Sequence, residues 1–267
     1  MAYKKYEPFI TDNFTVLSKE TRQYIPFELN SIQKKFIKEA SGADLILKAR
    51  QQGFSSLILA LFATDFILKE NTLSVVVADI ADNALDLLAR VKGYIQSYED
   101  TNGFKIPLKY NSKYEIENAM NGSRYIIGTA ENTKFGRSKT ITNLHLSEAA
   151  FYTKIRDILA GAGTALVPNG KFIIETTANG FNELKMLWDE SVAGLNTFNP
   201  LFYKASDFYS EEFLSREKLR LGRLFPQEYP ETPEEAFLNS GDMFFDNQAL
   251  SIYSEFINRI GDVATIS

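Results

Sequence analysis

The chain has 267 residues, of which 45% are hydrophobic, which is enough for one large α/β domain with a buried core. It has no cysteine, so disulfides and cysteine-ligated zinc or iron–sulfur sites are excluded. The formal net charge of −5 argues against a protein that coats nucleic acid by bulk electrostatics, although a local loop can still contact DNA.

The single histidine, His145, lies in an apolar run and is predicted to be a packed strand residue. One histidine leaves no His-based metal site and no Ser-His-Asp triad. No stretch approaches about 18 uninterrupted apolar residues, and the N-terminus lacks the apolar segment of a signal peptide. The sequence therefore predicts no membrane partner and a cytosolic location.

The first predicted strand, at 43–47, leads into a loop and then into an apolar helix at 57–68. The loop, at 48–56, reads Lys-Ala-Arg-Gln-Gln-Gly-Phe-Ser-Ser. Strand, glycine-containing loop and helix follow one another in this order in a phosphate-binding P-loop. The N-terminus of the helix is a natural anion site. Backbone amides there are predicted to wrap the phosphates of a nucleotide, with the contacts made by Gln51, Gln52, Gly53, Phe54, Ser55 and Ser56.

This loop departs from the common signature, G-x-x-x-x-G-K-S/T, in which the lysine reaches the β- and γ-phosphates and the hydroxyl binds Mg²⁺. Gly53 and Ser55 hold the positions of the last glycine and the hydroxyl, but Phe54 holds that of the lysine. The positive charge lies upstream instead. We predict that Arg50 neutralises the phosphates, with Lys48 as the second candidate.

Strand and helix patterns continue to alternate after the loop. The further predicted elements are a strand at 73–78, a helix at 82–98, a hairpin at 114–129, and strands at 141–146 and 171–176. The hairpin has Asn121-Gly122 at its centre, a strong signal for a type I′ turn. This alternation predicts an α/β fold with a mainly parallel central sheet, helices on both faces, and ligands at the carboxyl ends of the strands.

The strand at 141–146 runs into Ser147-Glu148 and resembles a Walker B element, an apolar strand that ends in an acidic pair. Serine replaces the first acid, so Glu148 alone remains to act as general base or to position the attacking water. The alternative is a strand-end glutamate that caps the next helix. The position of Glu148 after a phosphate loop favours the catalytic role.

Three other segments carry candidate residues. Arg137, in the glycine-flanked basic loop 135–139, is a candidate arginine finger acting on the γ-phosphoryl group of a neighbouring subunit, and the alternative is a solvated loop. Thr177 and Asn179 are candidates for sensing the γ-phosphate, although a simple strand-to-helix turn explains the same residues. The side-chain amide of Gln33 can pair with both the hydrogen-bond acceptor and the donor edge of adenine. The default alternative is an exposed glutamine on a helix surface.

Together these motifs resemble the N-terminal ATPase domain of the large terminase subunit, the motor that packages DNA into tailed-phage and herpesvirus capsids. The resemblance covers residues 24–240. It rests on five motifs in the family's order: the adenine-reading Gln33, a deviant Walker A at 50–53, a trans-acting arginine at 136–138, a Walker B region at 144–150 and a coupling motif at 175–180. Residues 225–237 resemble the segment that closes this domain.

The resemblance implies a P-loop (ASCE-type) NTPase core with a small lid subdomain, for which 197–225 is our candidate. It implies that 1–240 is the ATPase motor domain and that 241–267 begins a linker towards a nuclease domain. We expect an isolated or truncated motor domain without nuclease activity. The implied cofactors are ATP and Mg²⁺, with the metal held by Ser55 and, weakly or through a bound water, by Ser147.

The resemblance also implies the partners. They are double-stranded DNA, a homo-oligomeric ring on the procapsid portal and the small terminase subunit. The isolated domain is expected to be a monomer in the cytoplasm of an infected host cell. Two alternatives stay open: a helicase-type nucleic-acid motor, and a degenerate nucleotide-binding module in which Phe54 and Ser147 mark lost catalysis.

Overall fold

The structure is a computed structural model that describes residues 3–132 and 139–237. Within these ranges the strands form an eight-stranded sheet and a separate two-stranded ribbon. The ribbon pairs β1 (Thr15–Leu17) with β2 (Tyr24–Pro26). The order in the large sheet is β10 (Asn199–Tyr203), β3 (Ala43–Lys48), β9 (Leu166–Thr176), β8 (Ile141–Ser147), β4 (Leu73–Ala78), β7 (Arg124–Thr129), β6 (Glu115–Asn118) and β5 (Leu108–Asn111).

The large sheet is mainly parallel, as predicted. All neighbouring pairs from β10 to β7 are parallel, and β6 and β5 continue the sheet as antiparallel strands. The helices, in chain order, are α1 (Tyr6–Asn13), α2 (Ser31–Glu39), α3 (Phe54–Leu68), α4 (Ala81–Asn102), α5 (Ile155–Gly161), α6 (Glu183–Val192), α7 (Glu211–Leu221), α8 (Phe225–Glu228) and α9 (Pro233–Phe237).

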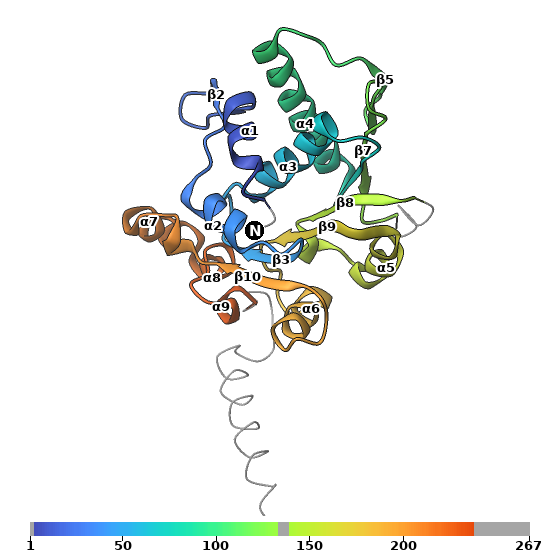
Figure 1. Cartoon of the computed structure of the whole chain (residues 1–267). Helices are drawn as coiled ribbons and strands as arrows, with labels where there is room; N and C mark the ends of the chain where they lie inside the picture. Colours follow the sequence, from blue (N-terminus) through green and yellow to red (C-terminus); the bar gives the residue numbers. More distant parts are fainter. Residues whose placement is uncertain (1–2, 133–138, 238–267) are drawn as a thin grey trace, which may run out of the picture.

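Helices cover both faces of the sheet (Figure 1). Helices α1 to α4 share one apolar cluster with the sheet, and α5, α6 and α9 share the other. In β4, Val76 contributes to the first cluster, and its neighbours Val75 and Val77 contribute to the second. Alternate side chains of a strand point to opposite faces, so a strand buried on both faces is apolar throughout. The predicted apolar strand at 73–78 is β4, which lies inside the sheet between β8 and β7 and is buried on both faces.

Helix α3 is buried along most of its length, and it joins the predicted phosphate loop to the core. Its residues from Leu57 to Ala63 have almost no exposed surface. A helix that is apolar all round needs a partner on every side. The first turn of α3 is thereby fixed relative to the sheet. In the described part of the chain, none of the helices combines the length and the apolar composition that crossing a membrane requires.

The predicted hairpin is present, but its predicted type I′ turn is wrong. Strands β6 and β7 are antiparallel, and residues 119–123 join them. Type I′ requires positive φ at both central residues. Gly122 has φ +70, but Asn121 is not among the residues with positive φ. Its side-chain amide donates instead to the carbonyls of Phe66 and Ile67, so contacts with the end of α3 determine the turn.

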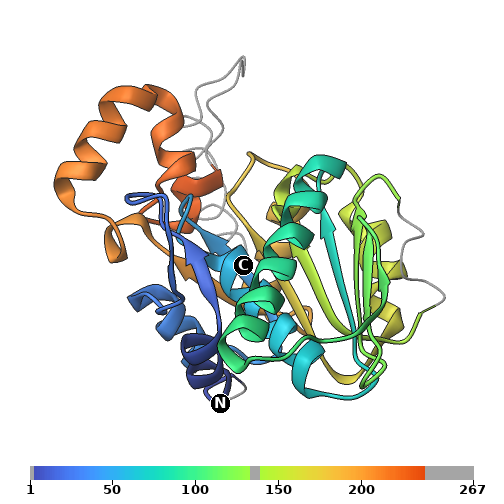
Figure 2. The ribbon, with the colours of Figure 1, turned by 90° about the horizontal axis from the view of Figure 1, so that it is seen from above.

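The predicted lid at 197–225 is wrong for its first part. Residues 199–203 form strand β10, which pairs in parallel with β3 at the edge of the central sheet. The following segment, with α7 and α8, packs through an aromatic cluster around Tyr229. Figure 2 shows this segment, in orange, at the β10 end of the molecule. A lid role for residues 205–225 stays a prediction.

Candidate nucleotide-binding site

The carboxyl ends of β3, β9 and β8 meet at one edge of the sheet. Glu175 in β9 pairs with Ile46 in β3 on one side and with Ser147 in β8 on the other. Paired residues of adjacent strands point to the same face, as do residues two apart in one strand. Lys48, Glu175 and Ser147 therefore share the face that α3 covers. This register of the strands brings the three residues together at the predicted site.

A buried ion cluster lies at this edge. The Lys48 ammonium is 2.9 Å from Glu148 Oε1 and 3.1 Å from Glu175 Oε2. Burial would lower the pKa of Lys48, but the charges of Glu148 and Glu175 outweigh it and raise the pKa above its ordinary value. Burial would likewise raise the pKa of Glu175, but the charge of Lys48, with a hydrogen bond from Ser55, holds that pKa well below its usual range. Lys48 and Glu175 are therefore both charged at neutral pH.

Two serine hydroxyls converge on the same carboxylate oxygen of this cluster. Ser55 Oγ and Ser147 Oγ donate to Glu175 Oε1 at 2.7 and 2.8 Å. His145 Nε2 lies 3.4 Å from that oxygen, and the ring is fully buried, which confirms the prediction of a packed strand residue. Glu175 begins the predicted coupling motif at 175–180 but was not among the predicted site residues. The sequence signal is the spacing. Glu175 lies two residues after the core residue Ile173, so both side chains point to the same face of β9.

Glu148 lies just beyond β8 and faces Lys48. Its backbone has φ +54, and its Oε2 accepts hydrogen bonds from Thr177 N at 3.1 Å and Thr177 Oγ1 at 3.3 Å. The short helix η1 (Ala149–Phe151) follows, but no side-chain capping bond is made by Glu148. The structure therefore excludes the capping alternative. Asn179 Nδ2 contacts the carbonyl of Ala150 at 3.4 Å, so both predicted sensor residues touch the segment that begins at Glu148.

The loop before α3 has the shape of an anion cradle. Gln51 has φ +61 and Gly53 has φ +84, and α3 begins at Phe54. The first backbone N–H groups of a helix lack intrahelical partners and, with the helix dipole, favour an anion. These donors lie in the same helical turn as Ser55, whose hydroxyl contacts the carboxylate that Lys48 pairs with. This arrangement is what a phosphate group requires.

Gln33 supports the loop from α2. Its Nε2 donates to the carbonyl of Gly53 at 2.8 Å, and its Oε1 accepts from Asn30 N at 3.0 Å in a capping box. Only 3% of Gln33 is exposed, so the default of an exposed helical glutamine is wrong. Both ends of its amide are occupied by the chain. The adenine-reading role stays a prediction.

We expect Gly53→Ala to destabilise the fold by about 1–2 kcal/mol, because it adds a left-handed backbone penalty to crowding. A Cβ at Gly53 would lie 2.9 Å from Gln33 Nε2. Gly103→Ala is the matched control, since Gly103 has φ +71 and open space around it. Urea denaturation of both variants measures the difference. Equal losses would show that Gln33 yields to the added methyl group.

Several predicted loop contacts point away from the ion cluster. Phe54 is buried and its ring packs on Phe36 and Tyr203, with centroids 5.8 and 4.7 Å away. Gln52 Nε2 donates to the carbonyl of Lys204 at 3.0 Å, and Gln51 is exposed on the surface. A phosphate can therefore reach Phe54 through its backbone only. For these three residues and for Ser56, phosphate binding stays a prediction.

Arg50 lies outside the ion cluster. Its side chain is 57% exposed and pairs with Glu228 of α8, with 3.0 Å between Nη1 and Oε2. Its backbone N–H also donates to the carbonyl of Glu228 at 2.9 Å. Lys48, our second candidate, is the cation that the fold places beside Ser55 and Glu148. The predicted finger, Arg137, lies outside the described residues.

No protein-family model and no curated protein matches the sequence. Solved structures match its fold. The ATPase domain of the Thermus phage P74-26 large terminase is 16% identical with a TM-score of 0.58, over 77% of this chain and 93% of that domain. The HK97 bacteriophage large terminase is 19% identical with a TM-score of 0.65, over 85% of this chain and 53% of that protein. The chain has the fold of large terminase ATPase domains.

A third terminase adds a ligand to the comparison. The large terminase of a thermophilic bacteriophage, solved in complex with ATP-gamma-S, is 12% identical with a TM-score of 0.56. The match covers 75% of this chain and 51% of that protein. This chain thus spans about half the length of that terminase and of the HK97 terminase. The terminase resemblance seen in the motifs is confirmed for the fold.

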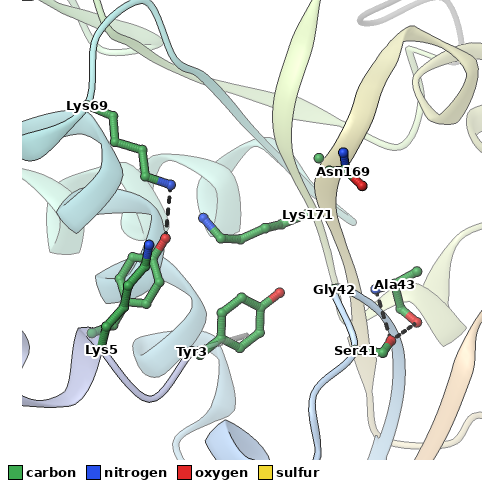
Figure 3. Close-up of a pocket in the computed structure, with 10 residues that line it drawn as sticks. Tyr3, Lys5, Ser41, Gly42, Ala43, Lys69, Asn169 and Lys171 are labelled. Carbon is green, nitrogen blue, oxygen red and sulfur yellow. Dashed lines mark hydrogen bonds between the residues drawn. The ribbon is translucent and has the colours of Figure 1, made fainter. Parts of the chain in front are cut away.

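A second polar cluster occupies the opposite edge of this terminase fold, where β3 begins (Figure 3). This cluster, which includes Lys69 and Lys171, lines a cavity of about 470 Å³. Both ammonium groups contact the buried Asp65. Burial lowers the pKa of Lys171 to about 8, although the charge of Asp65 opposes this shift. The cavity lies at the amino end of β3 and beside the first half of β9, away from the phosphate loop.

Lys171 should make stability rise with pH. Its folded pKa of about 8 lies below the ordinary 10.5, so between these values the unfolded chain binds more protons than the folded chain. The free energy of unfolding should therefore increase across this window, and Lys171→Met should lose that increase. Urea denaturation at about pH 7.5 and about pH 9.5 measures it. An equal increase in the variant would assign the effect to other groups.

Proposed function

We propose that this chain is an ATPase motor domain of the large terminase type, which hydrolyses ATP with Mg²⁺ to translocate double-stranded DNA into a procapsid. The observation that carries the proposal is the meeting of Lys48, Ser55 and Glu148 at one sheet edge. A phosphate cation, a P-loop hydroxyl and a candidate base are the parts that phosphoryl transfer needs. The likeness of the fold to terminase ATPase domains supports the same reading.

The loop and Lys48 bind the phosphates. Backbone N–H groups at the start of α3 receive phosphate oxygens, and the Lys48 ammonium supplies the positive charge. Lys48 is bonded to Glu148 in this structure, so a phosphate competes with that carboxylate for the ammonium. Arg50 remains the second source of charge, because its exposed guanidinium lies next to the same loop. The ATP-gamma-S complex of the thermophilic-phage terminase supports nucleotide binding by this fold.

Glu148 orients the attacking water. Its Oε1 faces Lys48 and its Oε2 is held by Thr177, so the carboxylate has a fixed direction. Loss of the γ-phosphate would change the charge that Lys48 faces and, through Glu148, the contacts of Thr177. Thr177 and Asn179 are thereby placed to couple hydrolysis to a movement of the chain. Arg137 from an adjacent subunit would complete the charge around the transferring group.

The residues present fit a magnesium ion. Among the described residues there is no group of three or more Asp, Glu or His that could hold a metal alone. Mg²⁺ in nucleotide sites keeps several waters and is bound by phosphates with one or two protein groups. Ser55 Oγ beside Glu175 supplies such oxygens. When bound, the ion would neutralise charge on the β- and γ-phosphates.

The partners belong to the same proposal. A homo-oligomeric ring on the portal, the small terminase subunit and a location in the infected host cell follow from the terminase resemblance. Arg137 acting in trans would leave an isolated subunit, expected to be a monomer, with an incomplete site. The range of about 10³ to 10⁵ known for arginine fingers makes this incompleteness measurable.

ATP turnover as a function of protein concentration, with and without duplex DNA, tests the proposal. We expect slow turnover at low concentration and a rise in specific activity as subunits associate. ATP binding without turnover at any concentration would favour the degenerate nucleotide-binding module. Strand separation of a DNA duplex by the same protein would favour the helicase-type motor.

A further inference from the structure

From the contacts of Glu175 we infer that this residue carries, on β9, the metal-site carboxylate that a Walker B element places at the end of its own strand, here β8. The inference rests on the proposed ATPase function and deepens it. Serine stands at the first acidic position of the Walker B element, which leaves that strand without its carboxylate. A carboxylate on the neighbouring strand occupies nearly the same space.

The register brings the two positions together. Ser147 and Glu175 are paired residues of adjacent parallel strands, and Ser147 Oγ donates to Glu175 Oε1 at 2.8 Å. Neighbouring strands lie about 4.8 Å apart, and a glutamate is one methylene longer than an aspartate. The longer side chain therefore reaches sideways to where an aspartate on β8 would end. Serine leaves the space for it.

The P-loop hydroxyl is bonded to the same oxygen. Ser55 Oγ donates to Glu175 Oε1 at 2.7 Å. A serine hydroxyl has one proton to donate and two lone pairs to offer. With its proton directed to Glu175, the oxygen of Ser55 keeps its lone pairs for a metal ion. The Ser147 oxygen keeps its lone pairs in the same way for a metal-bound water.

The charge of Glu175 also points to a cation beyond Lys48. The carboxylate has no exposed surface, and a buried carboxylate is costly unless positive charge compensates it. In this structure the compensation comes from Lys48, which Glu148 shares. When phosphates draw the Lys48 ammonium, a divalent cation held near Ser55 restores the balance. A purely structural ion pair would not require the two hydroxyls to converge on Oε1.

The test measures ATP affinity with Mg²⁺ and with EDTA, by calorimetry on the full chain. Wild type should bind ATP more tightly with Mg²⁺. Glu175→Gln should reduce that enhancement at least about tenfold, the loss typical of groups that orient metal ligands. It should not weaken ATP binding in EDTA, because Lys48 then has one competing carboxylate fewer. Glu234→Gln, in an exposed part of α9, is the control for loss of one negative charge.

The decisive variant moves the carboxylate back to β8. Ser147→Asp combined with Glu175→Ser should restore the Mg²⁺ enhancement that Glu175→Gln loses. Full enhancement in Glu175→Gln, or none in a folded transposed variant, would overturn the inference. If Glu175→Gln does not fold, the transposed variant decides alone, and failure of both to fold would make Glu175 a structural ion-pair partner only. If wild type binds no ATP under either condition, the proposed function itself fails.

Discussion

Lys48→Met should destabilise the folded chain by about 3–5 kcal/mol, the loss typical when one partner of a buried ion pair is removed. The Lys48 side chain is 4% exposed, and it is within ion-pair distance of both Glu148 and Glu175. Methionine fills a similar volume but leaves the Glu175 carboxylate buried without its ammonium. Urea denaturation measures the change in the free energy of unfolding.

A second substitution separates lost charge from lost packing. Lys48→Met combined with Glu175→Gln removes both charges, so the double variant should recover much of the stability. Arg50→Met is the matched control, because the Arg50 pair with Glu228 is exposed and should contribute less than about 1 kcal/mol. A loss in Arg50→Met as large as that in Lys48→Met would contradict this picture of the two cations.

The same two variants decide which cation serves the phosphates. Arg50 was the first candidate because Phe54 replaces the Walker lysine and the deviant Walker A motif at 50–53 begins with this arginine. The fold instead extends β3 through Lys48 and directs that side chain towards Ser55 and Glu148. ATP affinity of folded Arg50→Met tests the ranking. Affinity near that of wild type would leave the phosphate charge to Lys48.

The fold was predictable because its signals are local. Continuous apolar runs mark the buried strands, as in 73–78, which the structure reproduces without a shift. Alternation of these runs with helical patterns then requires parallel strands covered on both faces. The strand at 199–203 escaped prediction because it pairs only with β3, which lies far earlier in the chain. This segment is a strand because of its pairing with β3, which its own sequence pattern does not reveal.

The site residues that could be predicted are those that a single local motif identifies. Ser55, Glu148 and Thr177 each follow a strand in a recognisable order, and the structure brings them to one edge. Glu175 was missed because its role depends on register with β3 and β8, which single-strand patterns do not reveal. For Gln33 only the exposed alternative is wrong, because its amide donates to the carbonyl of Gly53 in a separate motif. Contacts between motifs are what the sequence left open.

Glu148→Gln should retain ATP binding and lose turnover by about 10² to 10⁴, the usual contribution of a general base. Glutamine has the same shape and still accepts the hydrogen bond that Thr177 N gives to Oε2. It cannot take a proton from water at neutral pH. Affinity should even rise slightly, because Lys48 loses a competing carboxylate and becomes more available to the phosphates.

Thr177→Val tests how Glu148 is held. The substitution removes the hydroxyl bond at 3.3 Å and keeps the backbone bond at 3.1 Å, so turnover should fall less than in Glu148→Gln. Single-turnover kinetics at saturating ATP separates chemistry from binding in both variants. Turnover near the wild-type rate in a folded Glu148→Gln would remove Glu148 as the base. Its carboxylate would then serve only to balance Lys48.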